Sequence, residues 1–373
     1  MENKISNERI YKFDNIKFLA ILLVVVGHVI SPYVGKSDMF KSLFIFIYTF
    51  HMPLFIFISG LFQKRFSDTN KLKLNKVTFY IALGFLLKLY VYVARVIADV
   101  KPRVNIFGDS NISWFMFVMA MFMVTAYLTR KVHPAVMLCV SLALGCVSGY
   151  FDFIDDTLYL SRFLVYLPFY LLGYYMTPQL LIKIEKHFVS KIVSGLSMLL
   201  YFIMCFRNLD FVYQLRRLFT GKNPFSTLPF ENCGFQHRLL CYLISALMCL
   251  AVFCFIPNIK VPIISKMGAN TLSVYFWHNP LIELLSATPF FAFMFDFGDP
   301  MYKILLLTFA LLLTLILSLN IFMVPLKALS KLIDKLKPLW CYVIIFAPFL
   351  IGAIFECKDF FIHLKTFFNK TNA

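Results

Sequence analysis

The chain has 373 residues, of which 60% are hydrophobic and only 15% are charged. Soluble domains carry about a quarter of charged residues, so this composition excludes an ordinary soluble globular protein. The formal net charge is +17, but the positive residues lie in short loops between apolar runs, which is the pattern that sets membrane topology. This distribution argues against binding to nucleic acid.

Apolar runs follow one another along the chain, and most reach the length that a helix needs to cross a bilayer. Backbone groups in hydrocarbon must find internal partners, so each run is predicted to be a helix. The sequence therefore predicts an all-α, polytopic membrane bundle of about 11 transmembrane helices. These are expected at residues 16–34, 41–62, 77–98, 112–129, 135–150, 158–176, 190–206, 238–256, 269–288, 302–324 and 339–356.

Lysine and arginine concentrate in the segments on one side of this predicted bundle. Cytoplasmic loops carry the excess of positive residues, so we predict a multi-pass protein of the cell membrane with its N-terminus in the cytoplasm and its C-terminus outside. The loop at 207–237 is then the longest external segment, and it is basic. It is expected either to contact an anionic lipid-linked saccharide or to cover the bundle.

The first predicted helix carries three ionisable residues within an apolar sequence. Asp14 and Lys17 are three residues apart, so they share a helix face and can form an ion pair near the cytoplasmic end. His28 follows eleven residues after Lys17, which places it about 16 Å deeper at 1.5 Å per residue. We expect either a site with a cation at its mouth and an imidazole inside, or a histidine that only hydrogen-bonds to a neighbouring helix.

Two further histidines lie in apolar runs, each beside a proline. His51 precedes Pro53, and His278 precedes Pro280. A proline in a membrane helix frees a carbonyl that must be satisfied nearby, so each pair indicates either a packing kink or a site. Together with His28 they are expected to bring three imidazoles to the middle of the bundle, and imidazole is the natural proton carrier near neutral pH.

Five cations lie within or at the edges of the predicted helices, and four of them are expected to be buried, namely Lys88, Arg95, Arg162 and Arg238; the fifth is Lys303. Few acidic residues are near them in the sequence, so an anionic ligand such as a phosphate explains them well. The alternative is that their side chains extend to the membrane interface. No metal centre is predicted, because the histidines lie on separate helices without ligand spacing and the nine cysteines form no CxxC pair.

Four segments resemble the acyltransferase-3 membrane family, in particular its fucose 4-O-acetylase-like branch. They occur in the order of that family and are FDNIKFLAILLVVVGH (13–28), FHMPLFIFISGLF (50–62), RFLVYLPFYLLGYY (162–175) and GANTLSVYFWHNPLI (268–282). Where the family carries an arginine, ten residues and a histidine, this chain has Lys17 and His28, and its third helix has no RxxR motif.

The family implies a ten-helix core at about 12–325, within a membrane domain at 1–338. Residues 339–373 would then form an additional C-terminal transmembrane helix and a short tail. The implied activity is transfer of an acyl group, usually acetyl, from cytoplasmic acyl-CoA to a hydroxyl of a cell-surface carbohydrate or its lipid-linked precursor. The expected partners are membrane lipid, acetyl-CoA as the donor and the carbohydrate; no bound cofactor is expected, and a homo-oligomer is compatible with the sequence.

Within this framework each ionisable residue has an expected role. His28 is the general base that removes the proton of the sugar hydroxyl. The remaining residues are assigned to substrate binding: Lys17 with Lys88 or Arg95 at the phosphates of coenzyme A, Asp14 as the partner that orients Lys17, His51 and His278 at the acceptor or the oxyanion, and Arg162 and Arg238 as further anion-binding groups.

Two other classes of protein share some of these features. Secondary transporters also use broken helices and charges at mid-membrane, so a transporter or flippase for lipid-linked saccharides is an alternative, although the sequence has no inverted repeat. A polysaccharide polymerase is the second alternative, because it would also suit the basic loop at 207–237.

Overall fold

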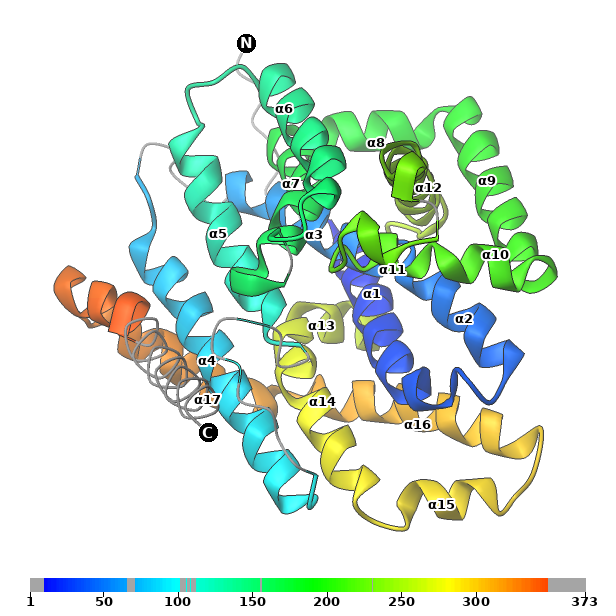
Figure 1. Ribbon diagram of the computed structural model, residues 1–373. Helices are drawn as coiled ribbons and strands as arrows, with labels where there is room; N and C mark the ends of the chain where they lie inside the picture. The colour runs from blue at the N-terminus through cyan, green and yellow to red at the C-terminus, as the bar shows by residue number, and fades with distance from the viewer. Residues whose placement is uncertain are drawn as a thin grey trace, which may run out of the picture.

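The computed structural model describes residues 10–65, 71–100, 105, 108, 112–154, 156–229 and 231–347. All the elements in this part of the chain are helical, which confirms the all-α prediction (Figure 1). The α-helices are α1 (Tyr11–Ile30), α2 (Asp38–Tyr48), α3 (His51–Arg65), α4 (Leu74–Ile97), α5 (Trp114–Leu128), α6 (Pro134–Val147), α7 (Leu160–Tyr175), α8 (Pro178–Lys186), α9 (Phe188–Arg207), α10 (Leu209–Gln214), α11 (Arg216–Phe219), α12 (Gly234–Phe255), α13 (Pro262–Met267), α14 (Thr271–Ser286), α15 (Phe290–Phe295), α16 (Met301–Leu317) and α17 (Asn320–Asp334).

Several of these helices are long and apolar enough to cross a bilayer. Five segments satisfy both conditions, and they are Tyr11–Tyr33, Asp38–Gln63, Leu74–Ile97, Phe188–Arg207 and Gly234–Phe255. The pair α16 and α17 forms a sixth candidate, bent by 52°. The fold is thus a membrane helix bundle, whereas a count of about 11 spans is not established. The last predicted run, 339–356, lies for much of its length outside the described residues.

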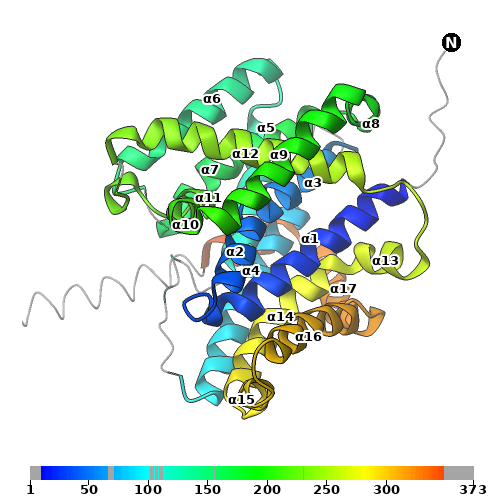
Figure 2. The ribbon, with the colours of Figure 1, turned by 90° about the vertical axis from the view of Figure 1, so that its right-hand side faces the viewer.

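Helix α1 runs through the centre of the bundle, as the two views show (Figure 1 and Figure 2). It packs against α2, α3, α14 and α16. Ile16, Ile21 and Val25 on this helix are fully buried. The polar side chains of α1 therefore contact protein on most sides. This contact lowers the free-energy cost of a polar site on this helix within the hydrocarbon.

The second predicted helix, 41–62, is broken at Thr49 and Phe50, between α2 and α3. Pro53 has no N–H to donate to the carbonyl of Thr49, four residues earlier. The hydroxyl of Ser245 on α12 donates to that carbonyl instead, at 2.6 Å. The Thr49 hydroxyl in turn contacts the hydroxyl of Tyr201 on α9 at 2.8 Å. The break is thus satisfied by hydrogen bonds, and it places His51 at the first position of α3.

Helices α3 and α7 approach each other at backbone contact distance. A Cβ atom at Gly60 would lie 2.2 Å from the carbonyl oxygen of Tyr170, and one at Gly173 would lie 2.0 Å from that of Phe57. Only glycine fits at such a crossing, as in other packed membrane helices. This contact fixes the spacing between α3, which carries His51, and α7, which carries Arg162.

The predicted helix at 302–324 ends early, because α16 stops at Leu317 and the chain bends into α17. Asn270 stabilises the bend, with its Nδ2 donating to the carbonyl of Ser318 at 2.8 Å and to Oδ1 of Asn320 at 2.9 Å. Ser273 donates to the carbonyl of Leu317 at 2.6 Å. These polar side chains satisfy the carbonyl groups that the end of α16 exposes.

The long helices give the bundle two ends, which we call the N-terminal face and the distal face. The N-terminal face carries the start of α1, where Asn15 Nδ2 donates to the carbonyls of Pro257 (3.3 Å) and Ile259 (3.0 Å) beyond α12. The distal face carries the end of α1 and the start of α2, where Lys41 pairs with Asp210 at 2.9 Å. In the predicted topology the start of α1 is cytoplasmic and the turn between α1 and α2 is external.

Candidate active site

A cavity of about 180 Å³ lies in the distal half of the bundle. It is bounded by the end of α1, the break between α2 and α3, and the starts of α5 and α7. Its lining residues are Val24, His28, Tyr48, His51, Met52, Ile112, Trp114, Arg162, Tyr166, Thr220 and Tyr275. Of the predicted site residues, the structure brings His28, His51 and Arg162 together in this one cavity.

His51 is held in a single orientation by its backbone environment. Its Nδ1 lies 2.8 Å from the carbonyl oxygen of Ile47. A carbonyl only accepts hydrogen bonds, so Nδ1 carries the proton and the neutral ring keeps a lone pair on Nε2. The ring of Tyr48 packs edge-on against it with centroids 4.8 Å apart. His51 therefore brings a basic nitrogen to the cavity without needing a charge.

His278 lies directly behind His28, with ring centroids 5.1 Å apart. It is fully buried, and its Nδ1 donates between the carbonyls of Val274 and Tyr275, both at 2.9 Å. Its Nε2 has no hydrogen-bond partner among the described residues. The three imidazoles thus lie near one another: His28 and His51 line the cavity, and His278 packs against the ring of His28.

Arg162 supplies the positive charge of the cavity. Its side chain is almost completely buried, and the guanidinium lies 4.7 Å from the ring centre of Trp114. Nε of Arg162 is 3.5 Å from Oδ1 of Asp156, and the other oxygen of that carboxylate is 3.4 Å from Nζ of Lys222. One carboxylate is thus shared by two cations at this corner of the cavity.

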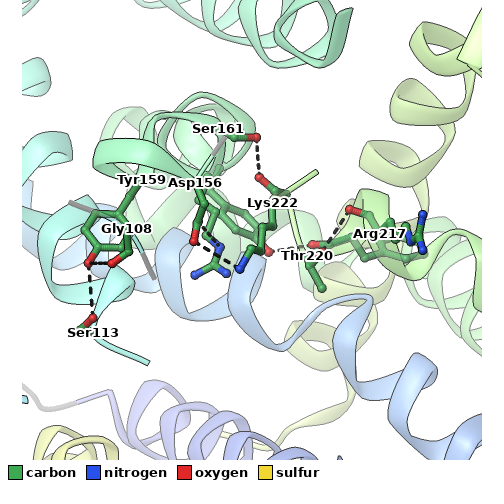
Figure 3. A network of polar contacts seen from close by, with 12 residues as sticks. Gly108, Ser113, Asp156, Tyr159, Ser161, Arg217, Thr220 and Lys222 are labelled. Carbon is green, nitrogen blue, oxygen red and sulfur yellow. Dashed lines mark hydrogen bonds and ion pairs between the residues drawn. The ribbon is translucent and has the colours of Figure 1, made fainter. Parts of the chain in front are cut away.

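Hydroxyl groups on α7 hold the segment after α11 over the cavity. Ser161 donates to the carbonyl of Gly221 at 2.8 Å (Figure 3), and Tyr166 donates to the carbonyl of Phe219 at 2.7 Å. Thr220, between them, lines the cavity. Of the two roles expected for the loop at 207–237, a cover over the bundle is the one that this arrangement fits.

The other predicted cations lie away from this cavity. Nζ of Lys88 donates to the carbonyls of Asn105 and Gly108, each at 2.7 Å. Arg95 pairs with Glu283 on α14 at 3.0 Å. Both residues thus tie α4 to its neighbours, and Lys88 does so through the chain that follows α4. Neither is brought close to Lys17 at the N-terminal face.

Arg238 is also buried, at 1% exposure, but in a separate environment. Its Nη1 donates to the carbonyl of Leu218 at 2.5 Å, and the guanidinium stacks 5.5 Å from the ring centre of Phe225. Its Nε and Nη2 have no hydrogen-bond partner among the residues described. Arg238 does not line the cavity of His28.

The predicted ion pair of helix one is present. Nζ of Lys17 lies 2.8 Å from Oδ1 of Asp14, close to the N-terminal face. A second ion pair at that face was not predicted: Lys12 contacts Glu185 on α8 at 2.7 Å and donates to the carbonyl of Phe253 at 2.8 Å. Sequence spacing finds the first pair because it lies on one helix turn, whereas the second joins residues far apart in the chain.

Several cavity residues were also not singled out from the sequence, among them Trp114, Tyr166 and Thr220, and neither was Asp156 as the partner of Arg162. Their only sequence signal is a polar or aromatic residue near the distal end of a helix, a pattern that recurs in most interfacial segments.

These observations define a membrane helix bundle in which one cavity is lined by imidazoles and a guanidinium. The family model described as an acyltransferase domain matches residues 10–319. Since this range covers most of the chain, the protein belongs to the acyltransferase-3 family and is a membrane acyltransferase. Searches of curated proteins and of solved structures gave no match to this chain.

Proposed function

We propose that this protein is an O-acyltransferase of the cell membrane, and that it moves an acetyl group from acetyl-CoA to a hydroxyl of a cell-surface carbohydrate or its lipid-linked precursor. Within the family, we propose that it is of the fucose 4-O-acetylase-like type. The observation that carries the proposal is the cavity in which His28 and Arg162 lie together. A base beside a fixed positive charge is what acyl transfer to an alcohol requires.

The reaction follows from these two groups. The imidazole of His28 takes the proton of the acceptor hydroxyl while the hydroxyl oxygen bonds to the thioester carbonyl carbon. The carbonyl oxygen becomes an oxyanion, which the guanidinium of Arg162 stabilises. The C–S bond then breaks, and the imidazolium returns the proton to the departing thiolate. His51 orients the acceptor through its neutral Nε2, and His278 keeps the ring of His28 in place.

The position of the cavity suggests how the two substrates meet. His28 lies in the last turn of α1, in the distal half of the bundle. With the N-terminus in the cytoplasm, the acceptor reaches the cavity from outside, whereas the donor reaches it from the N-terminal face. The eleven crossings expected from the sequence would then place the C-terminus outside.

The test is replacement of His28 by alanine. We expect the O-acetyl signals of the cell-surface polysaccharide to disappear from its NMR spectrum, because removal of a general base costs about 10²–10⁴-fold in rate. The amount and chain length of the polysaccharide should stay unchanged, which separates acyl transfer from export and from polymerisation.

The control is His187→Ala, which changes an exposed histidine between α8 and α9. It should leave acetylation intact. Full acetylation in cells whose only copy carries His28→Ala, at wild-type protein level, would refute the role of His28. Unchanged acetylation after deletion of the gene would refute the proposed function itself.

A further inference from the structure

A second pocket, of about 480 Å³, opens at the N-terminal face. We call it the inner pocket. It lies between the start of α1, helix α13 and the start of α17, and its lining residues are Tyr11, Lys260, Pro262, Ser265, Lys266, Ala269, Asn270 and Asn320. Its volume is within the range of pockets that hold a nucleotide-sized molecule.

The inner pocket is built against the first turns of α1. The hydroxyl of Ser265, in its wall, donates to Oδ1 of Asn15 at 2.7 Å. The backbone is equally close, since a Cβ atom at Gly268 would lie 1.9 Å from the carbonyl oxygen of Asp14. The pocket and the Asp14–Lys17 ion pair therefore belong to one packed unit.

The chemistry of the lining is that of an anion site beside a flat aromatic group. Lys260 and Lys266 are both exposed, and the lining contains no aspartate or glutamate. Nζ of Lys260 lies 5.9 Å from the ring centre of Tyr11. Asn270 and Asn320 are joined by a hydrogen bond of 2.9 Å and form a fixed amide pair at one wall. Lysine binds phosphate as a point charge, and a tyrosine face suits a planar base.

The cations that would otherwise bind a phosphorylated donor are engaged elsewhere. Lys88 donates to two carbonyls beyond α4, and Arg95 pairs with Glu283. Arg162 lies in the distal half of the bundle with His28. The two lysines of the inner pocket are, by contrast, on the face from which a cytoplasmic donor approaches.

We propose that the inner pocket binds the phosphorylated nucleotide end of the acyl donor, with Lys260 and Lys266 at the phosphates and Tyr11 against the base. This inference rests on the proposed function. Thirteen residues of α1 separate Asn15, at the pocket wall, from His28, which is about 20 Å along the helix axis. A donor anchored here must reach the cavity through a long, narrow arm, which is the construction of a coenzyme A thioester.

The experiment measures the dissociation constant of unacylated coenzyme A by calorimetry, with the purified full-length protein in nanodiscs of neutral lipid. The double variant Lys260→Gln/Lys266→Gln should weaken binding about tenfold or more, because each lysine contributes a charged contact. The matched control is Lys331→Gln/Lys335→Gln, which removes two exposed lysines from α17 and the turn that follows it. It should leave the dissociation constant unchanged.

Two further arms identify the source of the phosphate. ADP should compete with coenzyme A, whereas pantetheine, which lacks the nucleotide, should not. In nanodiscs that contain phosphatidylglycerol the affinity should stay the same. Displacement of coenzyme A by the anionic lipid would show that the pocket takes a lipid headgroup, and it would overturn the proposal.

The outcome is separable from that of the proposed function. His28→Ala should abolish acetyl transfer and keep coenzyme A binding. Acetyl transfer from acetyl-CoA with an unchanged KM in Lys260→Gln/Lys266→Gln would overturn this inference and leave the proposed function standing. Tight coenzyme A binding without any acetyl transfer by the wild type would overturn the proposed function and leave this inference standing.

The wild-type protein provides a second measurement that needs no variant. Coenzyme A should protect Lys260 and Lys266 from an amine-reactive reagent, as read by mass spectrometry, while Lys331 and Lys335 react as before. Equal reaction of all four lysines at saturating coenzyme A would contradict the proposed site.

Discussion

Arg162 is a buried cation whose surroundings define its role at the scale of single residues. Asp156 lies 3.5 Å from its Nε, and Trp114 covers one face of the guanidinium. Its planar group is thus fixed before a substrate arrives, and fixed donors stabilise a developing oxyanion at little reorganisation cost.

Replacement of Arg162 by alanine should therefore lower kcat by about 10²–10³-fold. Arg162→Lys should recover only part of this loss, because lysine keeps the charge and loses the planar donor geometry. The measurement is the rate of acetyl transfer by protein in detergent, with Arg207→Gln as the control at an exposed arginine of the distal face. A kcat within twofold of wild type in Arg162→Ala would show that Arg162 does not stabilise the oxyanion.

The three histidines show how far a sequence alone reaches at this scale. Their types and depths indicated a cluster, because an ionisable residue in an apolar helix must face a cavity or a partner. The partners themselves were not predictable. Lys88 and Arg95 have the same sequence signal as Arg162, yet carbonyls after α4 and a carboxylate on α14 engage them. Which cation meets a cavity depends on the packing of helices far apart in the chain.

At the scale of elements, the break between α2 and α3 positions His51. Pro53 frees the carbonyl of Thr49, and Ser245 on α12 satisfies it. The proline in the sequence indicated a break here, but the donor lies almost 200 residues later in the chain and had no sequence signal.

Ser245→Ala should destabilise the protein by about 1–3 kcal/mol, because it leaves a buried carbonyl without a donor. In the background of Pro53→Ala the same change should cost much less, since residue 53 then has an N–H for Thr49. Thermal unfolding in detergent measures both, and Ser197→Ala, at a half-buried serine of α9, is the control. Equal costs in the two backgrounds would show that the serine does not compensate for the proline.

The crossing of α3 and α7 is the second element that sets the site. Gly60→Ala would place a methyl group against the backbone of α7, so α3 and α7 must move apart. We expect a loss of about 1–3 kcal/mol in stability, although alanine is the better helix former. Acetyl transfer should fall with it, because His51 and Arg162 separate.

Gly35→Ala is the matched control for this change, since a Cβ there meets nothing within 4 Å. The unfolding temperature and the transfer rate of both variants are measured side by side. If Gly60→Ala matched Gly35→Ala in both, the close approach of the two helices would be irrelevant to the site.

At the scale of the whole molecule, the two faces differ in their expected access to reagents. Cys233, just before α12, is exposed on the distal face. Cys357 would also be outside in the predicted topology, so the experiment is done throughout in a Cys357→Ser background. There a maleimide that does not cross membranes should label Cys233 in intact cells, and Cys233→Ser should abolish this label. In the Cys233→Ser background, Lys331→Cys on the N-terminal face should be labelled only after the cells are permeabilised. Labelling of Lys331→Cys in intact cells, with Cys233 labelled only after permeabilisation, would show that the topology is the reverse of the predicted one.

The all-helical fold and the match to the family extend over most of the chain, and both were predictable from apolar runs and short motifs. The number of crossings stays a prediction. The runs 41–62 and 302–324 were each expected to form one helix, but each is divided by a break. Pro53 indicates the first break, whereas the side chains that satisfy the exposed carbonyls at both breaks come from helices far away in the sequence. The loop at 207–237 left two roles open from its charge alone, and only the hydrogen bonds from α7 indicate that it covers the cavity.

Helix α1 is unbroken from Tyr11 to Ile30, and it carries the wall of the inner pocket near one end and His28 near the other. A continuous helix has a fixed rise per residue, so the distance along α1 between the two sites is constant. The enzyme would then select its donor by length as well as by charge. A short thioester could react at His28 but would have no nucleotide to bind in the inner pocket. A nucleotide without the pantetheine arm could bind in the inner pocket but would carry no thioester to His28.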